Sequence, residues 1–214
     1  MRYYYTLMFE ISQSGGSLFN PLFYQYPSEE GAYEDITHSF MIGDAIKITP
    51  VLEESAQNVR SYFPKDKWFD VRAETVTHNY EDGKFIDLPA PWDSVNIHMR
   101  GGTIVPWLNS TGNTTESLLN SKLTIKVLRD SAGFAAGTVY IDDGRTASSV
   151  SDGNYKYYKL IMASGSLTFN KVSGGTGQST INQNEFIDRI VILDAEDLKE
   201  SKFQCALGND LTIY

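Results

Sequence analysis

Two acidic pairs are the residues of this sequence whose type suits acid–base chemistry. Asp142-Asp143 precedes Gly144, and Glu53-Glu54 follows the apolar pair that ends at Leu52. General acid–base catalysis requires carboxyl groups that face one substrate. Adjacent side chains in a strand point to opposite faces, so neither pair can readily do this. We therefore predict a hydrogen-bonded turn at Asp142-Asp143-Gly144 and a solvated strand end at Glu53-Glu54.

The histidines are too scattered to suggest a metal centre. His38, His78 and His98 each lack a second ligand at the short spacing of zinc sites. His98 alternates with the apolar residues of Val95–Met99, so we expect it on the opposite face of that strand. We predict a structural or surface role for each histidine, and neither a metal nor another cofactor.

The tryptophans are candidates for a sugar-stacking platform, because aromatic faces suit the apolar faces of sugar rings. We expect Trp68 and Trp92 to be packing residues rather than parts of such a platform. Trp107 precedes a polar loop and is the better platform candidate. We assign no catalytic or substrate-binding residue from these patterns.

Other motifs indicate local geometry or modification. Arg100-Gly101-Gly102 has no helix pattern after it and makes a poor anion site, so we predict a tight bend or bulge there. Asn109 and Asn113 each begin an N-glycosylation sequon in a segment expected to be an exposed loop. Cys205 is the single cysteine, so no disulfide can form within the chain.

Composition narrows the class of protein. The 214 residues carry a formal net charge of −9, and no cluster of Lys and Arg suggests nucleic-acid binding. No run approaches the length of about 18 apolar residues that a membrane span needs. The first residues do not resemble a signal peptide, because they lack an apolar core and a cleavage site. Aromatic residues form 13% of the chain, which favours β-sheet.

The first 27 residues predict a helix followed by a strand. Tyr4, Leu7, Met8 and Ile11 recur at helical spacing, and Gly15-Gly16 follows as a C-cap, so we predict a helix over residues 2–14. The apolar run 20–27 has a proline near each end and is short enough to be a buried strand.

From Ala45 onward, alternating apolar and polar residues predict a series of strands. Pro64-Lys65-Asp66-Lys67 is typical of a type I turn between two strands, and Asp82-Gly83 predicts a hairpin turn. The polar segment from Asn109 to Thr115 is the best candidate boundary between two β modules. Later strands are predicted at Val95–Met99, Leu123–Val127, Thr138–Ile141, Tyr155–Met162, Leu167–Val172, Asp188–Leu193 and Leu211–Tyr214.

An ordered series of motifs extends from Arg2 to about Gly144. Its members are Phe40-Met41-Ile42-Gly43-Asp44, Tyr62-Phe63-Pro64, Trp68-Phe69-Asp70, Leu88-Pro89-Ala90-Pro91, Arg100-Gly101-Gly102, Thr114-Thr115-Glu116-Ser117 and Val139-Tyr140-Ile141-Asp142-Asp143-Gly144. This series resembles the C-terminal portion of glycoside hydrolase family 31, in the lysosomal and intestinal maltase branch of the α-glucosidases. One departure is Asn20, where the family usually has Arg or a similar residue before Pro-Leu-Phe.

The resemblance implies both an architecture and a parent activity. Residues 1–44 are similar to the end of a catalytic (β/α)₈ barrel, 45–113 to a proximal antiparallel β-domain, and 114–214 to a distal β-sandwich. The family cleaves terminal α-linked glucose with retention, which requires two carboxyl groups about 5–5.5 Å apart. Its catalytic carboxylates precede the matching segment, so the resemblance transfers no catalytic residue to this chain. Arg100 would bridge to the barrel.

We therefore expect a mainly β fold that supports a catalytic barrel acting on α-glucan or maltose-like substrates. The resemblance implies a lysosomal or secreted location, and we expect the chain alone to be inactive. Two alternatives remain, a carbohydrate-binding β-sandwich and a plain scaffold module. A scaffold predicts that the helix around Tyr3–Ile11 packs on its own β-domain, whereas an enzyme's C-terminal part predicts an exposed apolar patch there.

Overall fold

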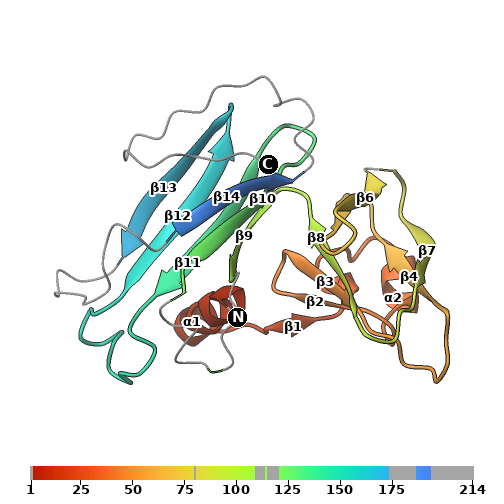
Figure 1. The fold of residues 1–214 in the computed structure, drawn as a ribbon, viewed down its shortest axis with the longest axis horizontal. Helices are drawn as coiled ribbons and strands as arrows, with labels where there is room; N and C mark the ends of the chain where they lie inside the picture. Colours follow the sequence, from red (N-terminus) through yellow and green to blue (C-terminus); the bar gives the residue numbers. More distant parts are fainter. Residues whose placement is uncertain (1, 80, 109–113, 115–120, 174–186, 194–214) are drawn as a thin grey trace.

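The computed structural model describes residues 2–79, 81–108, 114, 121–173 and 187–193, and its fold is mainly β (Figure 1). Its helical elements are α1 (Arg2–Ser14), the 3₁₀ turn η1 (Leu22–Tyr24) and α2 (Gly31–Glu34). Its strands are β1 (Phe19–Asn20), β2 (Phe40–Ile42), β3 (Ile46–Thr49), β4 (Asn58–Phe63), β5 (Lys67–Asp70), β6 (Thr75–Asn79), β7 (Lys84–Pro89), β8 (Asn96–Arg100), β9 (Thr103–Leu108), β10 (Leu123–Leu128), β11 (Ala135–Ile141), β12 (Lys156–Ala163), β13 (Ser166–Ser173) and β14 (Ile187–Leu193). The predicted strand Leu211–Tyr214 lies outside the described residues.

Helix α1 confirms the prediction for residues 2–14. Gly15 ends it with φ +75°, a left-handed conformation that favours glycine, and the Gly15 N–H donates to the Ile11 carbonyl at 2.8 Å. The helix is therefore capped where its apolar pattern stops.

The predicted strand over residues 20–27 is wrong. Strand β1 pairs with β2 but ends at Asn20, and η1 begins directly after Pro21. Proline has no N–H to continue a ladder and its φ of −65° suits the start of a turn. The Tyr26 N–H then donates to the Leu22 carbonyl at 3.1 Å, so the chain continues to turn after η1 and does not extend into a strand.

The first β region consists of two sheets. A six-stranded sheet has the order β1-β2-β3-β8-β5-β6, and β4 pairs with β7 in a separate two-stranded ribbon. The predicted hairpin at Asp82-Gly83 is therefore wrong, because β6 pairs with β5 while β7 pairs with β4. Burial of apolar side chains explains why β7 pairs with β4 and not with β6. The β4–β7 ribbon packs Val59, Phe63 and Leu88 against Trp68 of the larger sheet.

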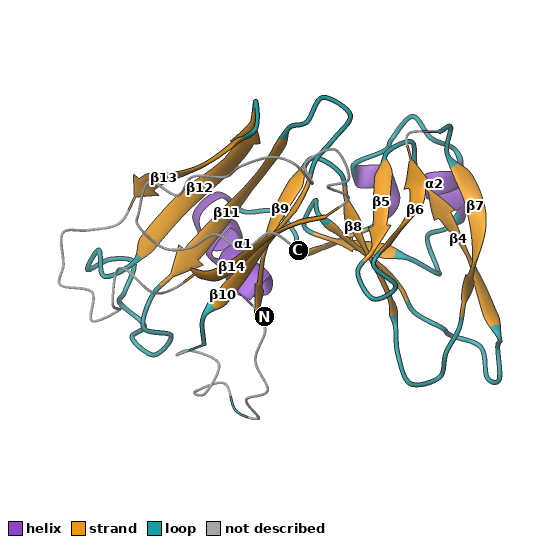
Figure 2. Ribbon diagram, turned by 45° about the horizontal axis from the view of Figure 1, so that its top comes forward, coloured by secondary structure: helices purple, strands orange, loops and turns teal. Residues whose placement is uncertain are grey.

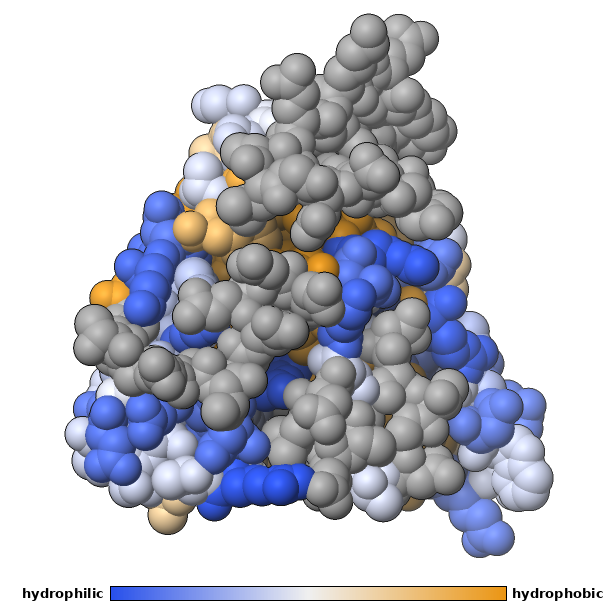
Figure 3. Space-filling view, turned by 60° about the vertical axis from the view of Figure 1, so that its left-hand side comes forward, coloured by the Kyte–Doolittle hydropathy of each residue, from blue (hydrophilic) through white to orange (hydrophobic). Residues whose placement is uncertain are grey.

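The second β region is a six-stranded sheet of order β13-β12-β11-β9-β10-β14, in which β10 and β14 are parallel. Gly101-Gly102 forms the predicted tight bend between β8 and β9, and Gly102 has φ +78°. The chain thus crosses from one sheet to the other at this bend. Figure 3 shows apolar side chains in the middle of one face of the molecule and polar side chains around its margin.

Helix α1 packs on β11 and β9 of the second sheet (Figures 1 and 2). The Tyr140 N–H donates to Thr6 Oγ1 at 3.1 Å. Glu10 Oε1 accepts hydrogen bonds from Thr138 Oγ1 and Tyr157 Oη, both at 2.6 Å. This face of the helix is covered by its own β structure, as the scaffold alternative predicts.

The same helix also contacts the first sheet. The Tyr3 hydroxyl donates to the Ile42 carbonyl at 3.1 Å and accepts from the Ala45 N–H at 3.2 Å. Gly43 permits this approach, because a Cβ there would lie 2.5 Å from the Tyr3 hydroxyl. The apolar core between the sheets is continuous and joins Tyr3 and Met99 to Val105. The division of the chain at residues 44 and 113 stays a prediction.

Candidate functional site

The Asp142-Asp143 pair forms a turn, as predicted. Asp142 accepts hydrogen bonds from the Tyr5 hydroxyl and the Gly144 N–H, both at 2.8 Å. Asp143 is exposed, and hydrogen bonds from the Thr146 hydroxyl and backbone N–H lower the pKa of its carboxyl to about 2. The two carboxylates therefore serve different partners. Glu53 and Glu54 are solvated, in the loop after β3.

Two of the histidines, His78 and His98, lie beside the same Phe63 ring, and His98 is 4.0 Å from the Asp70 carboxylate. His98 is fully buried and lies 3.1 Å from the Thr77 hydroxyl, His78 is buried beside Phe63, and His38 is half-buried beside Thr37. In the described part of the chain, no group of three or more His, Cys, Asp or Glu residues is arranged to hold a metal ion.

The tryptophans have three different environments. Trp68 is fully buried and donates its indole N–H to the Pro64 carbonyl at 3.0 Å, which confirms a packing role. Trp92 is 101% exposed, so the prediction that it packs is wrong. Trp92 lies in the loop between β7 and β8. The Lys126 ammonium group lies over one face of the Trp107 ring at 4.5 Å, and Trp107 is half-buried against the apolar core between the sheets.

Arg100 joins two acidic residues at the bend between the sheets. Its guanidinium lies 3.7 Å from the Asp44 carboxylate and 4.0 Å from that of Asp66. Asp66 also accepts a hydrogen bond from the Tyr26 hydroxyl at 3.2 Å. The predicted glycosylation sites Asn109 and Asn113, and the lone Cys205, lie outside the described residues.

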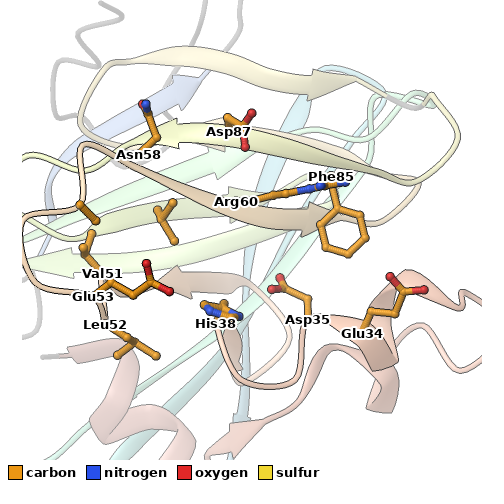
Figure 4. Close-up of a pocket in the computed structure, with 12 residues that line it drawn as sticks. Glu34, Asp35, His38, Val51, Leu52, Glu53, Asn58, Arg60, Phe85 and Asp87 are labelled. Atoms are coloured by element: carbon orange, nitrogen blue, oxygen red, sulfur yellow. The ribbon is translucent and has the colours of Figure 1, made fainter.

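A surface hollow of about 520 Å³ lies beside the β4–β7 ribbon (Figure 4). One wall comes from residues 34–38 and the loop 51–56, and the other from β4 and β7. Its polar lining residues are Glu34, Asp35, His38, Glu53, Asn58, Arg60 and Asp87, and its apolar ones are Val51, Leu52, Ala56, Val59 and Phe85. The hollow brings several polar groups from separate parts of the chain together.

Arg60 is the central cation of this hollow. Its guanidinium lies 4.7 Å from the centre of the Phe85 ring, an arrangement that favours a cation–π contact. Arg60 and Asp87 are direct cross-strand partners in the ribbon, so their opposite charges lie on one face. Figure 4 shows Arg60 extending toward Phe85 along this wall.

Asp35 fixes the opposite wall. This carboxylate is buried and accepts hydrogen bonds from the Ser39 hydroxyl, the Ser61 hydroxyl at 2.8 Å and the Tyr62 N–H at 2.9 Å. It therefore ties the segment after α2 to the middle of β4. Sequence patterns gave no indication of this link, because its partners are 26 and 27 residues away.

Lys47 lies behind Asp35 and is fully buried. Its ammonium group donates to Thr49 Oγ1 at 2.8 Å and to Ser61 Oγ at 2.5 Å, and it lies 4.4 Å from the centre of the Phe63 ring. Burial lowers the pKa of Lys47 to about 7, although the Asp35 charge opposes the shift. The alternation of residues 46–48 placed Lys47 on the face opposite Ile46, but only the covering ribbon buries it.

His98 shares this buried polar layer. Burial, followed by the nearby Lys47 charge, lowers the pKa of His98 to about 3, so its ring is neutral near pH 7. The prediction that His98 is structural and lies opposite the apolar face of its strand agrees with this position.

Several large apolar side chains of the N-terminal segment are exposed. Met8 is 55% exposed, Phe19 53% and Ile36 55%, and Tyr24 and Tyr33 are exposed as well. Aromatic contacts join Phe19 to Tyr4 and Phe40, and Phe23 to Tyr24 and Tyr33. Helix α1 thus has one face covered by the second sheet and exposes Met8 to solvent. Among the described residues, no helix has the length and apolarity to span a membrane.

Comparison with known proteins identifies the relatives of this chain. Residues 15–105 match the family profile described as glycosyl hydrolase family 31 C-terminal domain. The chain is 37% identical over 161 residues to a probable maltase-glucoamylase 2 of Homo sapiens, and 34% identical over 142 residues to an alpha-glucosidase of Hordeum vulgare. These matches cover 75% and 66% of this chain, but only 6% and 16% of the relatives.

Solved structures share the fold. The DNJ-bound glucosidase II alpha subunit matches with a TM-score of 0.78 and 22% identity over 89% of this chain and 21% of that one. The GH31 alpha-xylosidase from Xanthomonas citri matches with a TM-score of 0.73 and 21% identity, over 89% of this chain and 20% of that one. The chain thus spans about a fifth of the length of each of these two proteins.

Proposed function

Because the chain belongs to glycosyl hydrolase family 31, whose C-terminal domain its residues 15–105 match, we propose that it is the non-catalytic C-terminal part of an α-glucosidase. The parent enzyme would remove terminal α-linked glucose from maltose-like or starch-like oligosaccharides with retention of configuration. The names of the human and barley relatives support this substrate class. A lysosomal or secreted location belongs to the same proposal.

In this proposal, the role of the 214-residue chain is to support a catalytic (β/α)₈ barrel. In such barrels the reacting groups lie on loops at the C-terminal ends of the strands, so neighbouring domains can shape the rim of the site without contributing carboxylates. Residues 1–44 would complete the barrel, 45–113 form the proximal β-domain and 114–214 the distal one. Arg100, held by Asp44 and Asp66, would fix the angle at which the chain leaves the barrel.

The observation that supports this role most directly is the exposed apolar surface of the N-terminal segment. Met8, Phe19 and Ile36 are each more than half exposed, although α1 is firmly attached to the second sheet. Large apolar side chains that are more than half exposed mark candidate interaction sites in soluble proteins. A barrel packed against this segment would remove them from water.

Three measurements test the proposal. The purified 214-residue chain should not hydrolyse a chromogenic α-glucoside, and it should bind the barrel portion of the barley relative, produced as a separate polypeptide. A chimera in which the chain replaces the matching segment of that relative should regain α-glucosidase activity. Turnover by the chain alone that is sensitive to mutation, or no association with the barrel, would contradict the proposal.

Carbohydrate binding without a catalytic partner is the second candidate function. The full exposure of Trp92 favours it, because an exposed indole face can stack on a sugar ring. Glucan titrations followed by tryptophan fluorescence test this alternative, which predicts saturable binding that is lost in Trp92→Ala.

A further inference from the structure

The hollow beside the β4–β7 ribbon has the size of a ligand site. Its volume of about 520 Å³ falls within the range of roughly 300–1,000 Å³ that is usual for small-molecule sites. It opens to solvent between two walls that come from separate parts of the chain (Figure 4). A short oligosaccharide can therefore enter without displacing either wall.

The polar groups of the hollow match a neutral polyhydroxylated ligand. Glu34 and Glu53 supply carboxylate acceptors from one wall, while Arg60 and Asn58 supply donors from the other. Sugar hydroxyls both donate and accept hydrogen bonds, so they can use both kinds of group. Asp87 adds a further carboxylate beside Arg60, and this surplus of negative charge disfavours phosphorylated ligands.

Apolar surface lies next to these polar groups. Leu52 is 61% exposed, and the Arg60 guanidinium lies over the Phe85 ring at 4.7 Å from its centre. Sugar rings present apolar C–H faces, which pack on such surfaces. The mixture of charged groups with exposed apolar surface distinguishes the hollow from an ordinary solvated acidic face.

Both walls are held in place before any ligand arrives. Asp35 fixes the segment after α2 through Ser61 and the Tyr62 N–H, and the Phe85 contact orients Arg60. Groups that are already ordered lose less conformational entropy on binding. The hollow is thus preorganised by contacts that do not themselves consume the groups facing solvent.

We propose that this hollow is a non-catalytic binding site for a short α-linked gluco-oligosaccharide. The identity of the sugar rests on the proposed function. The site would hold a glucan chain on the proximal β-domain while the barrel acts on its terminal glucose. Arg60 and Asn58 donate to sugar hydroxyls, Glu34 and Glu53 accept from them, and Leu52 packs against a ring face.

Titration of maltoheptaose into the 214-residue chain, followed by amide NMR shifts, tests the inference. Saturable shifts should concentrate on residues 34–38, 51–60 and 85–87. Arg60→Ala and Asn58→Ala should each weaken binding at least about tenfold, the equivalent of 1.4 kcal/mol. Arg72→Ala is the matched control, because Arg72 is exposed but outside the hollow, and it should bind like the parent chain.

The remaining outcomes either overturn the inference or count against the proposed function alone. Absence of saturable shifts, or binding that Trp92→Ala removes and Arg60→Ala preserves, would overturn it. Shifts at the hollow with spermidine but not with maltoheptaose would show a site for cations instead. If the chain does not bind glucan, the proposed support of the barrel still stands, because that function is tested separately by binding of the chain to the barrel. Glucan binding without such association would instead favour a stand-alone binding module.

Discussion

The Tyr5 hydroxyl lies 2.8 Å from the Asp142 carboxylate, although 137 residues separate the two in the sequence. Tyr5 belongs to α1, and Asp142 belongs to the turn after β11. The Tyr140 hydroxyl donates to the same carboxylate at 2.9 Å. Burial and the Asp142 hydrogen bond raise the pKa of Tyr5, so the phenol remains a donor at physiological pH. This contact joins the first helix to the second sheet.

Tyr5→Phe should lower the free energy of unfolding by about 1.5–3 kcal/mol, because the variant lacks a hydrogen bond to a charged group. Urea denaturation followed by circular dichroism measures the change. Tyr24→Phe is the control: Tyr24 is 64% exposed, and its substitution should stay within about 0.5 kcal/mol. Equal effects of the two substitutions would show that the Asp142 contact does not hold the helix.

Lys47→Met should change how stability depends on pH. The folded chain has a Lys47 pKa of about 7 and the ordinary value is 10.5, so between these values the unfolded chain binds more protons. Stability of the parent chain should therefore rise with pH across this window, by at most about 1.4 kcal/mol per pH unit. Below pH 7 both states carry the charge, and the full cost of burying it remains.

Urea midpoints measured from pH 6 to pH 10 test this prediction. Lys47→Met removes the titrating group, keeps most of the side-chain volume and should flatten the rise, with higher stability than the parent at pH 6. Lys65→Met is the control, since the Lys65 side chain is 61% exposed. A parent chain whose stability follows the same pH curve as Lys47→Met would refute the role assigned to Lys47.

His98→Gln should reduce the loss of stability in acid. The pKa of His98 is about 3 in the folded chain and ordinarily 6.5, so the unfolded chain binds the extra proton between these values. Stability of the parent should therefore fall as pH decreases below 6.5. Thermal unfolding at pH 6.5 and pH 4.5 should show a smaller drop for the variant, and an unchanged drop would contradict burial of a neutral ring.

Met8→Glu should weaken binding of the chain to a family 31 barrel without unfolding the chain. Met8 is 55% exposed on α1, and a carboxylate buried there would lose its hydration. We expect the dissociation constant to rise at least about tenfold, or 1.4 kcal/mol, in a biolayer assay. Val172→Glu is the matched control, because Val172 is 56% exposed on β13, at the far edge of the second sheet. Equal weakening by both variants would exclude α1 as a specific contact.

Local patterns were sufficient for most of the elements. Helical spacing and a terminal glycine predicted α1 over its observed length, and alternation predicted β10 to β14 within a few residues. The Asp142-Asp143-Gly144 turn followed from the opposite directions of adjacent strand residues. These features depend on neighbours in the sequence, where steric and hydrogen-bonding preferences act directly.

The features that could not be predicted from the sequence depend on pairing between strands that are far apart in the chain. Alternation placed Lys47 opposite Ile46, but it could not show that β4 and β7 would cover that face and bury the ammonium group. Pairing of β4 with β7 also replaced the expected Asp82-Gly83 hairpin and formed one wall of the hollow. Periodicity indicates which side chains share a face, because it follows from backbone geometry. What covers that face depends on which distant segments bury the most apolar surface, and only the folded chain determines this.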